Sequence, residues 1–136
     1  MNRSPAHRRY VWRVAAAMSG YLVTLFAAEY LIDNQRLDGP AAWLVALLPG
    51  LCVASVFWAL GRLLVEESDE YLRALMVRQM LIASAIALTA ATIYGFFENY
   101  GLVGHFDAFY IAILYFFGLG VGAAVNKFTV GDSGGC

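Results

Sequence analysis

Four long apolar runs constrain this chain more than any other feature of its sequence. They cover residues 11–32, 41–65, 80–97 and 108–125. At 1.5 Å per residue, helices over these runs are roughly 27 to 36 Å long, enough to cross a hydrocarbon core of about 30 Å. Because 61% of the 136 residues are hydrophobic and only 14% are charged, the chain cannot cover a soluble domain with polar side chains. The pattern predicts an all-α, four-helix transmembrane bundle.

Polar segments between the runs indicate where the helices begin and end. Asp-Gly-Pro, ending at Pro40, breaks the first helix and supplies a favourable first residue for the second. In the acidic block before the third helix, Ser68 is the expected N-cap, with Asp69 and Glu70 at the positive end of the helix dipole. We expect one membrane domain over residues 1–136, with helices at about 11–32, 41–65, 69–98 and 107–127 and a disordered tail at 129–136.

The basic residues lie almost entirely on one side of this arrangement. Arg36 is the one basic residue on the other side, and the eight others are Arg3, Arg8, Arg9, Arg13, Arg62, Arg73, Arg78 and Lys127. Cytoplasmic loops carry the excess of lysine and arginine in membrane proteins. The sequence therefore predicts that both termini are cytoplasmic.

Small residues recur every four positions along each run, which is the spacing of one helix face. The expected packing positions include Gly20 on the first helix, Ala87 on the third, and Gly118 and Gly122 on the fourth. On the second helix the same spacing joins Ala46, Gly50 and Ala54. Since lipid removes the hydrophobic drive between helices, close approach through small residues has to contribute to packing. Gly118 and Gly122 are open to two interpretations, contact within the bundle or a dimerisation face in a homo-oligomer.

A dense group of charges precedes and enters the third helix. We take its members as candidate partner-binding residues: Glu66, Glu67, Asp69, Glu70, Arg73 and Arg78. One interpretation is a docking surface for a membrane or cytoplasmic protein. The other is a solvated helix start whose surface ion pairs each contribute only about 0 to 1 kcal/mol.

Acidic side chains dominate the opposite side, and two of them lie about one turn inside the apolar runs. These are Glu29 and Glu98, the candidate ion or proton sites. Ionisable groups inside a transmembrane segment are a functional hypothesis by default. Near the interface, however, a carboxylate can reach the headgroups, so anchoring is the competing interpretation.

The sequence lacks the patterns that carry common chemistries. His7 and His105 fall on opposite sides of the expected membrane, which excludes a haem held between two histidines. There is no Cys-x-x-Cys, no His-Glu-x-x-His and no glycine-rich phosphate loop. A net charge of −1 gives no basis for a nucleic-acid partner. We expect no catalytic site, cofactor or metal site, and the lipid bilayer as the main partner.

The segment Glu-Glu-x-Asp-Glu-Tyr-x-Arg at 66–73, together with Tyr-Gly-Phe-Phe-Glu at 94–98, resembles small proteobacterial inner-membrane proteins with four transmembrane helices. The resemblance covers roughly the second half of the chain. It implies a multi-pass protein of the bacterial inner membrane, and it implies no mechanism.

Two function hypotheses remain open at this point. The first is a non-catalytic accessory or regulatory protein that binds a partner through residues 66–78. The second is a small oligomeric transporter or channel that uses Glu29 and Glu98 as coupling carboxylates. Transporters commonly place ionisable residues near the midplane, where these helices carry only Ser, Thr and Cys as polar groups.

Overall fold

The computed structural model describes residues 5–34 and 39–131, and within these ranges the chain is helical with no strand. The α-helices are α1 (Pro5–Glu29), α2 (Pro40–Glu66), α3 (Glu70–Asn99) and α4 (Phe109–Val130), and α1 continues into a π-helical turn, η1 (Tyr30–Asn34). Each α-helix provides a span long and apolar enough to cross a membrane. The predicted all-α fold with four transmembrane helices is thereby confirmed for the described residues.

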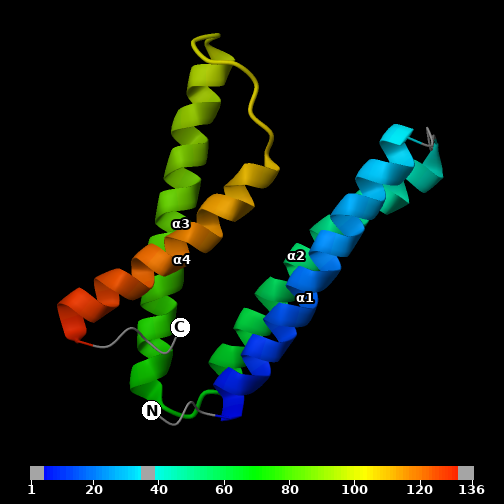
Figure 1. Cartoon of the computed structure of the whole chain (residues 1–136). Coiled ribbons are helices and arrows are strands. Elements are labelled where there is room, and N and C mark those ends of the chain that lie inside the picture. The colour runs from blue at the N-terminus through cyan, green and yellow to red at the C-terminus, as the bar shows by residue number, and fades with distance from the viewer. Residues whose placement is uncertain (1–4, 35–38, 132–136) are drawn as a thin grey trace. The chain divides into compact units, whose positions relative to one another are not determined.

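The chain divides into two compact units, residues 1–67 and 68–136. Each unit is built on one helical hairpin (Figure 1): α1 and α2 lie side by side along their lengths, and α4 crosses α3 obliquely. Each hairpin is described below by itself. The prediction that the two form a single membrane domain stays a prediction.

The α1–α2 interface is built from aliphatic side chains of α2 and small residues of α1. Val56, Ala59 and Leu63 are buried on α2, and Ala28 is buried on α1. At Gly20 a Cβ atom would lie 3.5 Å from Cys52 Sγ, which is ordinary van der Waals contact. The predicted small-residue face of α2, Ala46, Gly50 and Ala54, is exposed and takes no part in this hairpin. Larger side chains on a different face fill the interface instead.

The α3–α4 interface depends on two glycines of α4, which have no side chain at the points where the helices meet. A Cβ atom on Gly118 would lie 2.8 Å from Ala83 Cα, and one on Gly122 would lie 2.8 Å from the Gln79 carbonyl oxygen. Neither approach leaves room for a methyl group. Gly118 and Gly122 thus let the two backbones meet, and the buried Ala87 continues the α3 face.

Local sequence explains most helix ends. Pro40 opens α2 after Gly39, and α2 runs through Pro49 without interruption. At the end of α3, Gly101 adopts a φ of 71°, its N–H donates to the Glu98 carbonyl, and the Leu102 N–H donates to the Phe97 carbonyl. This is the bonding pattern of a Schellman motif, which ends a helix by satisfying its last carbonyls.

Three details differ from the predicted bounds. The first helix begins at Pro5, so residues 5–10 of the basic segment before residue 11 are helical. The N-cap of α3 is Asp69 and not Ser68, because the helix begins at Glu70 and the Asp69 carboxylate accepts hydrogen bonds from the Tyr71 and Leu72 N–H groups. Helix α4 extends to Val130, so the first two residues of the predicted tail are helical, and residues 132–136 lie outside the described residues.

Candidate functional site

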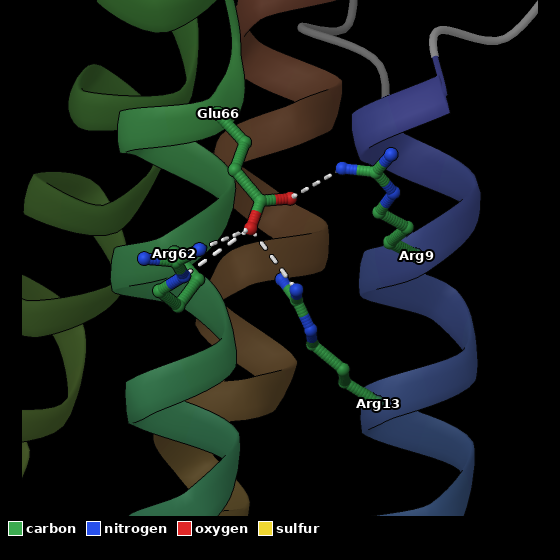
Figure 2. A network of polar contacts seen from close by, with 4 residues as sticks. All are labelled: Arg9, Arg13, Arg62 and Glu66. Carbon is green, nitrogen blue, oxygen red and sulfur yellow. Dashed lines mark hydrogen bonds and ion pairs between the residues drawn. The ribbon is translucent and has the colours of Figure 1, made fainter.

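A cluster of charged side chains joins the start of α1 to the end of α2, and Figure 2 shows it. Glu66, the last residue of α2, points toward α1. Its Oε1 atom accepts hydrogen bonds from Arg13 Nη2 at 3.0 Å and from Arg62 Nη2 at 2.9 Å and Nε at 3.2 Å. Its Oε2 atom lies 3.9 Å from Arg9 Nη1. We call these four residues the arginine cluster.

Helical spacing explains the geometry of the arginine cluster. Arg9 and Arg13 are four residues apart on α1, and Arg62 and Glu66 are four apart on α2, so each pair lies on one helix face. The Glu66 side chain is only 13% exposed, whereas those of Arg62 and Arg9 are 48% and 67% exposed. A shielded carboxylate thus holds two helices together while two guanidinium groups reach solvent.

An aromatic ring supports the cluster on its α2 side. The Arg13 guanidinium carbon lies 5.5 Å from the ring centre of Trp58, within range of a cation–π interaction. Trp58 is itself 60% exposed. Tryptophan is enriched where a membrane meets water, because its ring is apolar and its N–H is polar.

The predicted partner-binding residues serve different purposes in the structure. Glu66 belongs to the arginine cluster, Glu67 is buried with 4% exposure, and Asp69 caps α3. Glu70 and Arg73 are exposed on the first turns of α3. The remaining member, Arg78, is exposed and donates to Thr129 Oγ1 on α4 at 3.1 Å.

The two candidate ion or proton residues have different surroundings. Glu29 is exposed near the end of α1. Glu98, near the end of α3, lies 2.7 Å from His105 Nδ1 in the α3–α4 loop, and His105 Nε2 lies 3.8 Å from Asp107. The hydrogen bond to Glu98, its negative charge and the charge of Asp107 raise the pKa of His105 above its ordinary value of 6.5. Glu98 is therefore tied to the loop outside the membrane span.

Neighbouring aromatic contacts give this loop a defined conformation. The Tyr94 hydroxyl donates to the Gly104 carbonyl at 2.9 Å, and the ring of Tyr94 lies 5.1 Å from that of Phe106. These contacts place His105 beside Glu98 by fixing the residues on either side of it.

Two amide side chains connect α3 and α4 at their close approach. Gln79 Nε2 donates to the Leu119 carbonyl on α4, and Asn126 Nδ2 donates to the Leu75 carbonyl on α3, both at 2.9 Å. Gln79 and Asn126 are 3% and 0% exposed. Each helix thus supplies one amide that bonds the backbone of the other.

Sequence reasoning missed the function of several of these residues. It placed Glu66 in a docking surface, because its partners Arg9 and Arg13 are more than 50 positions away and no local pattern connects them. The sequence patterns do not point to Gln79, which lies where the charged start of α3 meets its apolar stretch. A polar amide in such a helix is the signal that could have found it, since side-chain amides hydrogen-bond across helices in membranes.

The chain's sequence and structure were compared with known proteins in three ways. No family model, no curated protein and no solved structure matches it.

Proposed function

We propose that this chain is a multi-pass protein of the bacterial inner membrane, with both termini in the cytoplasm, and that it is a non-catalytic accessory or regulatory protein. It binds a membrane or cytoplasmic protein partner through the first turns of α3. The orientation rests on the distribution of eight basic residues against one. The compartment rests on the resemblance of residues 66–73 and 94–98 to proteobacterial inner-membrane proteins.

The observation that carries the docking proposal is the exposure of the first turns of α3. Glu70, Tyr71 and Arg73 are exposed there, directly after a link of three residues between α2 and α3. Tyr71 is 48% exposed beside charges of both signs. Tyrosine and arginine are enriched where proteins bind one another, and mixed charge sets partner choice and orientation. We define Glu70, Tyr71 and Arg73 as the docking face.

The polar groups within the helices favour an accessory protein over a transporter. The hydroxyl groups of Ser19, Thr24, Ser55, Thr92 and Thr129 all donate to carbonyl groups of their own helices. Gln79 and Asn126 bond α3 to α4. These side chains satisfy the backbone and join helices. The Glu98 carboxylate of the transporter hypothesis is bonded to a loop histidine.

Charge reversal at two positions of the docking face tests the proposal. Glu70 lies in the first turn of α3, so Glu70→Lys should weaken the helix start by about 0.3 to 1 kcal/mol, whereas Arg73→Glu adds a favourable negative charge near the same end. If residues 70–73 matter only for helix stability, both variants should keep the partners of the parent, and only their melting temperatures should change. If they bind a partner, both variants should lose it.

The measurement is co-purification of partners from gentle detergent, with thermal melting followed by circular dichroism. We expect both variants to remain folded and to lose the proteins that co-purify with the parent. Lys127→Glu, which reverses an exposed charge near the end of α4, is the control and should keep them. The docking proposal fails if the parent captures no partner, or if both α3 variants capture the same proteins as the parent.

A further inference from the structure

The arginine cluster has an excess of positive charge, because its arginines outnumber its carboxylate. Three guanidinium groups face the single Glu66 carboxylate. Three guanidinium groups offer about fifteen N–H donors, and a carboxylate offers about four acceptor sites. Of these donors, three hydrogen-bond to Glu66 Oε1. The cluster is therefore complementary to a further anion.

The exposed members of the cluster are placed to meet such an anion. Among the described residues, the polar contact of Arg9 is the long ion pair to Glu66 Oε2, and its side chain is 67% exposed. Arg62 lies across the hairpin and is 48% exposed. Arg13 is more shielded, and its Nη1 atom is buried with no hydrogen-bond partner among the described residues. Guanidinium groups bind phosphate oxygens through two parallel hydrogen bonds, which suits a phosphate group better than a chloride ion.

The surroundings indicate a lipid as the source of that phosphate. Trp58 is exposed beside Arg13, and Trp12 and Val65 are 73% and 76% exposed on the same hairpin. Exposed apolar side chains next to the cluster can contact acyl chains, and indole rings favour the headgroup level. Basic residues beside a membrane span attract anionic lipids of the cytoplasmic leaflet.

We propose that the arginine cluster at the ends of α1 and α2 is a binding site for the phosphate headgroup of an anionic phospholipid. Arg9 and Arg62 contact the phosphate, Arg13 supplies positive charge behind them, and Glu66 joins the two helices that carry these side chains. Because Glu66 competes for the same donors, it also limits the affinity of the site. The proposal rests on insertion of the hairpin in a membrane and does not depend on the docking face.

A titration of delipidated protein in neutral detergent tests the site, with bound lipid counted by native mass spectrometry. We expect phosphatidylglycerol to bind the parent more tightly than phosphatidylcholine does. Arg9→Gln should weaken phosphatidylglycerol binding about fivefold, the effect of one basic residue at a membrane surface. Arg8→Gln is the matched control, because Arg8 is exposed on the same helix outside the cluster and its loss changes the net charge equally.

A second variant distinguishes a lipid site from a purely structural contact. Glu66→Gln should loosen the hairpin yet tighten phosphatidylglycerol binding, provided that circular dichroism shows retained helix. The lipid site is disproved if phosphatidylglycerol and phosphatidylcholine bind equally, if Arg8→Gln and Arg9→Gln weaken binding equally, or if folded Glu66→Gln binds phosphatidylglycerol less tightly than the parent. Displacement of phosphatidylglycerol by inorganic phosphate at equal concentration would instead assign the site to free phosphate.

Discussion

His105 is the residue whose protonation depends most clearly on its neighbours outside the membrane spans. Its Nδ1 atom lies 2.7 Å from Glu98, and this contact is the main reason that its pKa is raised. A raised pKa in the folded protein means that the protonated form is favoured by folding. The pair therefore contributes its full stabilisation below the ordinary pKa of 6.5 and loses it as pH rises through the raised value.

We expect Glu98→Gln to lower the midpoint of the His105 titration, measured from histidine ring signals by nuclear magnetic resonance. Asp107→Asn should lower it less, because Asp107 lies 3.8 Å from Nε2 and contributes less to the shift. The His105 side chain is 77% exposed, so we expect any structural change on its titration to be confined to the α3–α4 loop. Equal midpoints in the parent and in Glu98→Gln would contradict this assignment.

At the same scale, the start of α3 shows how far local sequence rules reach. The acidic block predicted a capped helix start, and the structure has one, displaced by a single residue from Ser68 to Asp69. Serine and aspartate cap helices about equally well. The rules therefore identify the turn, and only the backbone conformation decides which of two adjacent capping residues occupies the position.

Among the helices, the α3–α4 crossing has the least tolerance for added volume. Gly118→Ala would place a Cβ atom 2.8 Å from Ala83 Cα, whereas Gly120 on the same helix is exposed and has nothing within 4 Å of its Cβ position. Overpacking typically costs about 1 to 3 kcal/mol. We expect Gly118→Ala to lower the melting temperature in detergent and Gly120→Ala to keep or raise it, because alanine favours helix over glycine.

The comparison of Gly118 and Gly120 is matched, because both variants gain the same methyl group within one helix turn. If the helices separate or slide without cost, the two proteins should melt at the same temperature. That result would mean that α3 and α4 do not depend on close backbone contact.

Helix positions could be predicted from the sequence much better than helix faces. Span length and hydropathy identify all four helices, since only long apolar runs can cross a bilayer. The face of each helix that packs against its neighbour is harder to predict, because residues that contact lipid and residues that contact another helix are both apolar. Four-residue spacing therefore selected Gly118 and Gly122, which are buried, and equally Gly50 and Ala54, which are exposed.

For the whole molecule, the distribution of basic residues predicts the orientation in the membrane. Reporter fusions at Ser68 and after Lys127 should behave as cytoplasmic, and a fusion at Gly104 in the α3–α4 loop should behave as periplasmic. The arrangement follows from eight basic residues on one side and one on the other. A periplasmic signal from the Ser68 fusion would reverse the assignment of both the docking face and the arginine cluster.

The arginine cluster was less predictable from the sequence than the fold, because its residues come from two segments that are far apart along the chain. Arg9, Arg13 and Glu66 were each visible in the sequence as juxtamembrane charges. Their pairing depends on α1 and α2 lying antiparallel in a register that the apolar side chains set. The sequence therefore predicts that this end of the hairpin is positively charged, whereas only the structure shows which arginines contact Glu66.

The polar contacts that join each hairpin have a consequence for the order of events during synthesis. Glu66 is the last residue of α2, and Asn126 lies near the end of α4, so each hairpin is connected by a residue that the ribosome adds late. Arg9 and Arg13 precede Glu66 by more than 50 residues. Until α2 is complete, the two arginines lack the carboxylate that they contact in the hairpin. In the proposed orientation, these uncompensated positive charges would favour the cytoplasmic side and so retain the N-terminal end of α1 there while the rest of the hairpin is made.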